Sequence, residues 1–241
     1  FAGTNNRTTD SDSSSSTEIE STYKQIPNND PHLVGLWHMN NDWTDSSGNG
    51  NDGTANGGAT FTTDAKLGSH AGNFDGTADS VYTTYDYDTD KFIGSLWFKL
   101  DTIDTQQTLY SLADDIGGGT TQNRTAYIDI LSDNTLELGI WVTDPSSQWT
   151  SINGDTTLIA DRWYHLHWSF SNDNKYELYL NGSLEAENNS HSYATIYTSA
   201  DLREYIGSDF EDDAVQYPMD GQIDEVAIYN RTLSPEEIKA H

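Results

Sequence analysis

A glycine-rich stretch between Trp37 and Thr54 carries the residue types that bind metal ions. Its glycines at 48, 50 and 53 allow tight turns. The oxygen donors around them are Asp42, Asp45, Asn49, Asn51 and Asp52. Ca²⁺ takes about six to eight oxygen ligands from flexible loops of this kind. The spacing is not that of an EF-hand, and a metal-free turn held by side chain–backbone hydrogen bonds explains the same residues equally well. Both interpretations stay open.

The common catalytic and nucleic-acid-binding signatures are absent. The sequence has no G-x-S-x-G elbow, no phosphate-binding loop and no H-E-x-x-H motif. It has no cysteine, which excludes disulfides, thiolate metal sites and cysteine nucleophiles. The net charge of −28 would repel nucleic acid and anionic membrane surfaces. No apolar run approaches the roughly 18 residues that cross a bilayer, so we expect no membrane insertion.

The elements that must position these residues are β-strands. From Leu33 onward, short apolar stretches alternate with Gly, Asn and Asp turns, a pattern typical of an all-β sandwich. Asn181-Gly182 after a strand-like run predicts a type I′ hairpin turn. Strands are expected at Val34–Met39, Ala71–Phe74, Ser80–Thr84, Ile93–Leu100, Gln107–Ala113, Ala126–Leu131, Leu136–Val142, Tyr164–Phe170, Tyr176–Leu180 and Gln222–Tyr229.

Alternation within four of these strands assigns their side chains to two faces. In 164–170, for example, the large apolar residues share one face, and the two histidines share the other with Ser169. If the four strands belong to one sheet, that second face is a mixed aromatic and polar surface. Its members are Trp97, Tyr127, Trp141, His165 and His167.

The two ends of the chain read differently. Residues 1–30 are rich in Ser, Thr, Asn and Asp and have few apolar residues, which favours a linker or stalk. The alternative is an arm that orders against a neighbouring subunit. At the other end, residues 221–229 predict a buried strand. After a turn, Ser234 as N-cap, Pro235 and Glu237 predict the start of a short helix.

Several motifs in order carry a resemblance to a known family. They are Trp37–Gly53, Ala71–Tyr82, Phe92–Lys99, Arg162–Gly182, Ile206-Gly207 and Gly221–Leu233. Together they resemble the laminin-G-like members of the concanavalin A-like lectin/glucanase superfamily, over about residues 33–240. The resemblance implies a concanavalin A-like jelly-roll β-sandwich of two antiparallel sheets with a short C-terminal helix, formed by residues 31–241 as one domain.

The resemblance also implies a bound Ca²⁺. In such modules the N-terminal loop and the start of the last strand lie close together. The expected ligands are therefore Asp45, Asn49, Asn51 and Asp224, with Asp42 and Asp52 behind them. Members of the superfamily place calcium differently, and some bind none.

Glycan binding is the activity that the resemblance implies, and flat aromatic faces for C–H stacking are what it needs. Trp149, in the polar loop 144–150, is the first candidate, although it would equally well fold back over a sandwich edge. The alternative site is the face that holds Trp97, Tyr127, Trp141, His165 and His167. A structural role is favoured for the two histidines, and no third ligand is evident for a metal shared between them.

These observations predict a non-catalytic carbohydrate-binding or adhesion module that is secreted or lies at the cell surface. One alternative is a structural subunit of a surface filament or layer, self-associating through residues 1–30. A glycan-degrading enzyme is a weaker alternative, because the E-x-D-x-E strand of related glucanases is absent. N-x-S/T sequons are compatible with a surface glycoprotein and occur at Asn6, Asn123, Asn181, Asn188 and Asn230.

Overall fold

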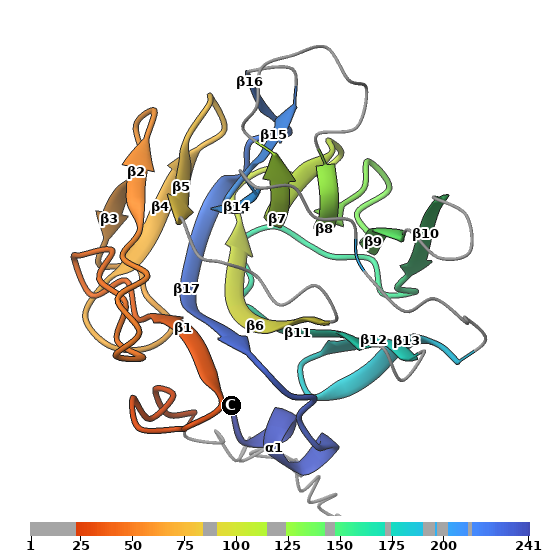
Figure 1. Cartoon of the computed structure of the whole chain (residues 1–241). Coiled ribbons are helices and arrows are strands. Elements are labelled where there is room, and N and C mark those ends of the chain that lie inside the picture. Colours follow the sequence, from red (N-terminus) through yellow and green to blue (C-terminus); the bar gives the residue numbers. More distant parts are fainter. Residues whose placement is uncertain are drawn as a thin grey trace, which may run out of the picture.

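The structure is a computed structural model, and it confirms the expected sandwich (Figure 1). It describes residues 23–83, 91–114, 124–142, 148–171, 175–189, 196, 202–211 and 214–241. Asn6, Asn123 and most of the expected N-terminal stalk lie outside these residues. Among the described residues, no helix is long and apolar enough to cross a membrane.

Two large antiparallel sheets face each other. Sheet A has the strand order β13-β12-β11-β6-β17-β4-β3, and β1 pairs with β17 beyond this path. Its strands are β1 (Leu33–Trp37), β3 (Thr60–Thr62), β4 (Ala71–Asp75), β6 (Lys91–Leu100), β11 (Tyr164–Ser171), β12 (Lys175–Leu180), β13 (Ser183–Asn188) and β17 (Asp220–Tyr229).

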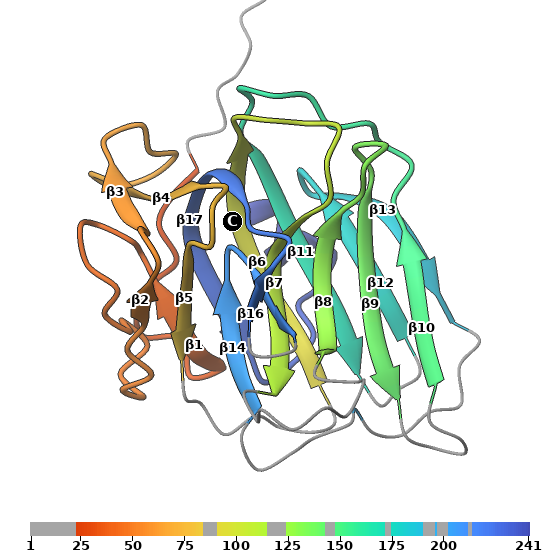
Figure 2. The ribbon, with the colours of Figure 1, turned by 90° about the horizontal axis from the view of Figure 1, so that it is seen from above.

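Sheet B has the order β10-β9-β8-β7-β14-β5-β2. Its strands are β2 (Thr54–Asn56), β5 (Ser80–Thr83), β7 (Gln107–Asp114), β8 (Arg124–Ile130), β9 (Leu136–Val142), β10 (Gln148–Asn153) and β14 (Leu202–Ile206). A separate two-stranded ribbon is formed by β15 (Asp209–Glu211) and β16 (Ala214–Gln216). Figure 2 looks onto sheet B, with sheet A behind it, and the ribbon lies against β7 and β14 of sheet B.

The core lies between the apolar faces of the two sheets. Trp168 of β11 packs against Phe92 of β6, with ring centroids 5.7 Å apart, and against Tyr110 of β7 in the opposite sheet, at 5.2 Å. All three side chains are fully buried. The alternation expected for 164–170 is therefore confirmed: the aromatic and aliphatic side chains point inward, and His165, His167 and Ser169 point away from sheet B.

A second apolar cluster covers the far face of sheet A. Ile26, Leu233 and Ile238 pack there against residues of the sheet that include Ile93 and Tyr229. Ile238 belongs to the C-terminal helix α1 (Pro235–Ala240), which lies below sheet A in Figure 1. The folded part of the chain therefore extends back at least to residue 23 and includes the last eight residues of the segment expected to be a linker.

The predicted helix start is confirmed in detail. The Ser234 side chain accepts a hydrogen bond from the Glu237 amide, and the Glu237 carboxylate accepts one from the Ser234 amide. This reciprocal pair satisfies two N–H groups that would otherwise be unpaired. Arg231 adds a two-pronged contact to the same carboxylate, at 2.6 and 2.9 Å. These bonds fix the turn that places Leu233 over sheet A.

One carboxyl group lies inside the core. Glu204 of β14 is 1% exposed, and its Oε2 accepts a hydrogen bond from the Thr83 hydroxyl at 2.9 Å. Burial raises the pKa of Glu204 from 4.5 to about 7. The side chain is thus held in the folded protein chiefly as a neutral acid at mildly acidic pH.

Replacing Glu204 with Gln is expected to change how stability depends on pH. The pKa of Glu204 is higher in the folded chain than in the unfolded one, so wild type loses stability as pH rises from about 4.5 to about 7. The Gln variant lacks this loss, which amounts to about 3 kcal/mol at most. Its melting temperature relative to wild type should therefore rise across that window and level off above it. Thermal unfolding from pH 4 to 8.5 measures this, with the exposed Glu236→Gln as control; a difference that does not vary with pH would contradict it.

Candidate functional site

Three aromatic rings meet on the face of sheet B that points away from the core. Tyr127 comes from β8, Trp141 from β9 and Trp149 from β10. The Trp149 ring centroid lies 5.4 Å from that of Tyr127 and 5.4 Å from that of Trp141. Trp149 is 41% exposed, and the other two are half-buried. We call these three residues the aromatic platform.

Strand pairing explains how the platform forms. Trp141 lies directly opposite Trp149 in the β9–β10 pair, and Tyr127 lies opposite Gly139 in the β8–β9 pair. A Cβ atom on Gly139 would lie 2.1 Å from Cζ of Tyr127. The absence of a side chain at 139 therefore lets the tyrosine ring lie over β9, toward Trp149.

The expectation that Trp149 sits in a loop is wrong, because it belongs to strand β10. Its neighbours Ser151 and Asn153 share its outward face and are exposed, while Ile152 is buried. The sequence did contain a signal for this strand: Trp149, Ser151 and Asn153 alternate with the β-branched Thr150 and Ile152. The surrounding Pro, Ser and Gln residues concealed it.

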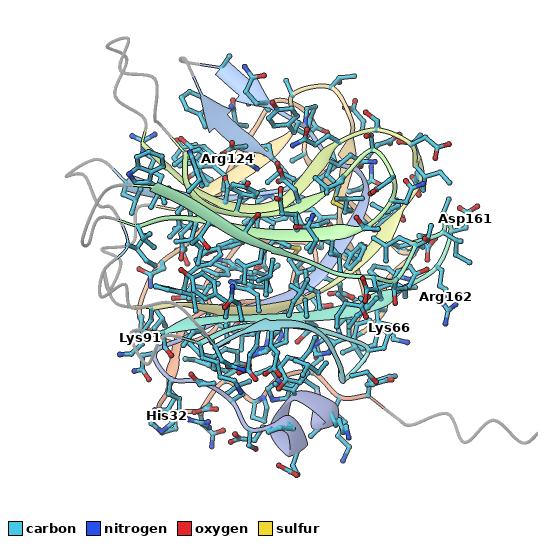
Figure 3. The ribbon with its side chains drawn as sticks, turned by 90° about the vertical axis from the view of Figure 1, so that its right-hand side faces the viewer. His32, Lys66, Lys91, Arg124, Asp161 and Arg162 are labelled. Carbon is cyan, nitrogen blue, oxygen red and sulfur yellow. The ribbon has the colours of Figure 1, made fainter. Side chains whose placement is uncertain are left out.

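A buried ion cluster supports the platform from one side. The Arg124 guanidinium carbon lies 3.4 Å from the centroid of the Tyr127 ring. Arg124 Nη2 donates to Oδ1 of Asp129 at 2.5 Å, and Nε lies 2.6 Å from Oδ2 of Asp209. The second contact is an ion pair without hydrogen-bond alignment. Both carboxylates are fully buried, and the arginine side chain is 8% exposed. Figure 3 labels Arg124 in the upper layer of the molecule, which is sheet B.

The electrostatics of this cluster follow from burial. Burial raises the pKa of Asp209 to about 6, although Arg124 acts in the opposite direction. Burial would lower the pKa of Arg124, but the carboxylates of Asp209 and Asp129 raise it overall. The Tyr127 hydroxyl donates to Glu137 at 3.3 Å, and burial together with that carboxylate raises the pKa of Tyr127. The platform therefore has a neutral tyrosine and the Arg124 cation, with the carboxyl groups of Glu137, Asp129 and Asp209 around them.

The structure corrects the alternative sugar face. Trp97, His165 and His167 lie in sheet A, whereas Tyr127 and Trp141 lie in sheet B, so the five residues do not share a surface. The three sheet A residues are at most 3% exposed. Tyr23 stacks edge-on against Trp97 at 4.7 Å, and the ammonium of Lys66 lies 4.4 Å from a Trp97 ring. A sugar cannot stack on a ring that is covered in this way.

The two histidines are buried and neutral. Burial lowers the pKa of His165 and of His167 to about 3. The described residues contain no group of three or more His, Asp or Glu side chains placed to hold a metal ion. The structural role favoured for these histidines agrees with this placement.

The oxygen-rich loop is organised around Asp45. Its Oδ1 accepts from the amides of Leu36 and Ser47, and its Oδ2 accepts from the Asn51 amide and the Ser47 hydroxyl. These four donors lower the pKa of Asp45 against the effect of burial. The Asp45 amide in turn donates to Asp52. All the acceptor positions of this carboxylate therefore point at protein donors.

The remaining loop residues also hold the turn. Asn49 and Asn51 both donate from their side-chain amides to the Val34 carbonyl, at 3.0 and 2.9 Å. Asp42 accepts from the Thr44 amide two residues on. Every predicted loop ligand thus takes part in a hydrogen bond within the turn or to β1. This agrees with the metal-free interpretation of the loop.

Asp224 lies with a different segment. Its Oδ2 accepts from the amides of Lys66 and Leu67, at 2.9 and 2.8 Å. Its Oδ1 is buried without a hydrogen-bond partner, and burial raises the pKa of Asp224 to about 7. The described contacts therefore separate Asp224 from Asp45, and Asp224 is the predicted ligand with a free buried oxygen.

Three predicted sequons fall on described residues. Asn181 is exposed in the β12–β13 turn with φ of 50°, and its Oδ1 accepts from the His165 amide. Asn230 is exposed, with its Oδ1 3.1 Å from the His32 ring, and Asn188 is half-buried in β13. Glycosylation at these positions stays a prediction.

Comparison with known proteins supports the architecture. A laminin-G-type family model, described as the concanavalin A-like lectin/glucanases superfamily, matches residues 75–239. The chain belongs to this superfamily. No curated protein sequence matches it.

Solved structures share the fold at low identity. Domain 4 of AbnA, an extracellular GH43 arabinanase from Geobacillus stearothermophilus bound to arabinotriose, is 21% identical with a TM-score of 0.67, covering 86% of this chain and 97% of that one. The CBM40 of a Ruminococcus gnavus sialidase bound to α2,3-sialyllactose is 19% identical (TM-score 0.54, 63% and 82%). The ligand-binding domain of botulinum neurotoxin serotype D with N-acetylneuraminic acid is 14% identical (0.63, 86% and 50%), so the present chain spans half of that one.

The Arg124 cluster makes a direct prediction about stability. Arg124→Met leaves Asp129 and Asp209 buried and unpaired, which should lower the free energy of unfolding by about 3–5 kcal/mol. Adding Asp129→Asn and Asp209→Asn to the same variant should recover most of this loss, because no buried charge then lacks a partner. Urea unfolding measures both. An Arg124→Met variant as stable as wild type would show that the ion cluster does not support the fold.

Proposed function

We propose that this domain is a non-catalytic carbohydrate-binding module that takes a neutral glycan on the aromatic platform, in a secreted or cell-surface protein. The observation that carries the proposal is the exposed Trp149 ring, held edge-on by Trp141 and flanked by Tyr127. Exposed Ser151 and Asn153 and the half-buried Glu137 share that face and offer hydrogen-bonding groups for hydroxyls. Glycan-bound domains of the same fold support it.

Charge favours a neutral ligand. Glu137, Asp129 and Asp209 outnumber Arg124 at the platform, and the whole chain has a net charge of −28. A uronate or sialate carboxyl would be repelled at this position. The sialic acid ligands of two structural neighbours therefore do not transfer to this site.

The carboxylates near the platform also favour binding over hydrolysis. A glycosidase needs two carboxyl groups flanking the sugar. Asp129 and Asp209 are fully buried against Arg124, which leaves Glu137 as the accessible carboxylate among these residues. One accessible carboxylate supports hydrogen bonding to a hydroxyl but not the paired chemistry.

Trp149→Ala is the direct test. Removing the exposed ring should weaken binding by about 2 kcal/mol or more, roughly thirtyfold, as for a central hot-spot residue. The melting temperature should hardly change, because the ring is not part of the core. A glycan array followed by calorimetry on the best neutral ligand measures this.

Leu184→Ala is the matched control, since Leu184 is 47% exposed and lies opposite Tyr179, on the outer face of sheet A and not on that of sheet B. It should bind as wild type does. Undiminished binding by Trp149→Ala, or equal loss in both variants, would place the glycan elsewhere. Binding restricted to sialylated or uronate glycans would contradict the neutral ligand.

We further propose that any calcium ion binds at Asp224 and not at Asp45. The buried Oδ1 of Asp224 accepts no hydrogen bond from the described residues and is one oxygen open to a cation, whereas the Asp45 carboxylate is filled by four donors. A cation there would offset the cost of burying an ionised carboxylate.

The two aspartates should respond differently to chelation. If calcium binds at Asp224, a chelator lowers the melting temperature of wild type, and Asp224→Asn abolishes that shift. Asp45→Asn should cost about 1–3 kcal/mol with or without calcium, because it turns an acceptor toward donors, and it should retain the shift. Differential scanning fluorimetry distinguishes these results. Loss of the shift in Asp45→Asn alone would restore the loop as the metal site.

A further inference from the structure

The far face of sheet A has an opening that the apolar cover does not fill. A cavity of about 330 Å³ lies between β11, β12 and the turn before α1. Ser169, Ser171, Lys175, Glu177 and Tyr179 line one side, and Leu233 with Pro235 forms the other. This volume is at the lower end of the range for small-molecule sites.

Strand pairing produces the polar wall. Ser169 lies opposite Glu177, and Ser171 lies opposite Lys175, so the outward positions of two adjacent strands form a grid of polar groups. The alternate residues of these strands, such as Trp168 and Leu178, point into the core. The grid is therefore fixed by the same alternation that builds the sandwich.

The chemistry of the wall is that of a hydroxyl-binding site. Oε1 of Glu177 accepts from the Lys175 ammonium at 2.5 Å and from the Tyr179 hydroxyl at 2.9 Å. Glu177 is 5% exposed, and no hydrogen bond is made by its other oxygen within the described part of the chain. Ser169 and Ser171 add two hydroxyl groups to this wall. Donors and acceptors thus line one side of the cavity, and Thr232, Leu233 and Pro235 close the other.

The charges around the cavity disfavour an anionic ligand. Lys175 pairs with Glu177 inside the cavity and lies 4.0 Å from Glu187 on the next strand, so no cation is left unpaired to hold an anion. Hydroxyl and carboxylate groups facing Leu233 and Pro235 match a ring with hydroxyls on one side and C–H groups on the other. We propose that this cavity binds one neutral sugar residue, as a second site separate from the aromatic platform.

The two sites lie on opposite outer faces of the sandwich. The platform is on β8, β9 and β10 of sheet B, and the cavity is on β11 and β12 of sheet A. In Figure 1 these strands form the two layers of the same end of the molecule. Two glycan chains can therefore be held at once, and linked binding raises the apparent affinity for a surface dense in glycans.

An NMR titration tests the cavity without depending on the platform. We expect D-glucose, D-galactose or L-arabinose to give saturable amide shifts at Ser169, Ser171 and Glu177, with a dissociation constant in the millimolar range. Trp149→Ala should leave these shifts unchanged. Glu177→Gln, which keeps the shape of the side chain, should weaken them about tenfold, while the exposed Glu236→Gln should not.

Asn189→Ala is a second variant that keeps the test informative if Glu177→Gln unfolds the chain, because Asn189 lines the cavity and is exposed. It should weaken the same shifts while the melting temperature stays that of wild type. Saturable shifts with methylammonium and none with the three sugars would overturn the proposal. The proposal would also be overturned if none of these ligands gave saturable shifts, or if Trp149→Ala abolished the shifts at the cavity.

Discussion

The pairing of strand β17 is the constraint on which the rest of the structure depends. This strand lies inside sheet A, with β6 on one side and β4 and β1 on the other. Residues 220–229 therefore pair with strands that lie more than a hundred positions earlier in the chain. A register shift between Asp224 and Ala227 interrupts the pairing with β6, and Glu225 adopts a φ of 51° there. Such a bulge turns a side chain toward a new partner.

That partner is the N-terminal segment. The Glu225 carboxylate accepts from the Gln25 side chain at 2.7 Å and from the Ile26 amide at 3.2 Å, and it contacts the His38 ring at 2.8 Å. The hydrogen bond to Glu225 raises the pKa of His38 against the effect of burial. One strained residue thus anchors the segment that brings Tyr23 over Trp97 and Ile26 into the second apolar cluster. This segment and helix α1 together cover the far face of sheet A, and the outer face of sheet B keeps the exposed Trp149 ring.

Much of the fold was predictable because the signal is local. Strands such as 164–170 and 222–229 show strict alternation or a continuous apolar run, and the Ser234 cap is a pattern within four residues. The short strands β2, β3, β15 and β16 have three residues each and carry no period long enough to detect. Sheet membership was not predictable from alternation, because a period of two gives the face of a strand but not its neighbours. Trp97 and Trp141 therefore looked equivalent, although one is buried in sheet A and the other belongs to the platform.

The residues that support the platform were not predicted from the sequence, because their contacts join segments that are distant in the chain. Arg124 reaches the Tyr127 ring because the register of β8 against β7 shifts between Leu112 and Ala113. Its partner Asp209 comes from a ribbon 85 positions later in the chain. The Asp45 loop shows the opposite limit. Its residues were correctly predicted to supply oxygen atoms, but such oxygens can bind either a cation or nearby N–H groups. The direction in which the N–H groups point determines which of the two occurs, and the sequence does not give that direction.

The hydrogen bonds and ion pairs that these carboxylates make within the fold also determine which groups remain on the outer faces of the domain. The carboxylates of Asp45, Asp129 and Glu225 are all committed to donors within the fold, so they are consumed in holding loops, rings and termini in place. What remains available on the outer faces is aromatic and hydroxyl-bearing: Trp149 with Ser151 on sheet B, and Ser169 with Ser171 on sheet A. Many buried carboxylates of this strongly acidic chain therefore act on the protein itself, and Glu137 is the accessible carboxylate at the platform. Long-range repulsion of acidic partners and the short-range contacts proposed for neutral sugars then have separate origins: the net charge sets the first, and strand register sets the second.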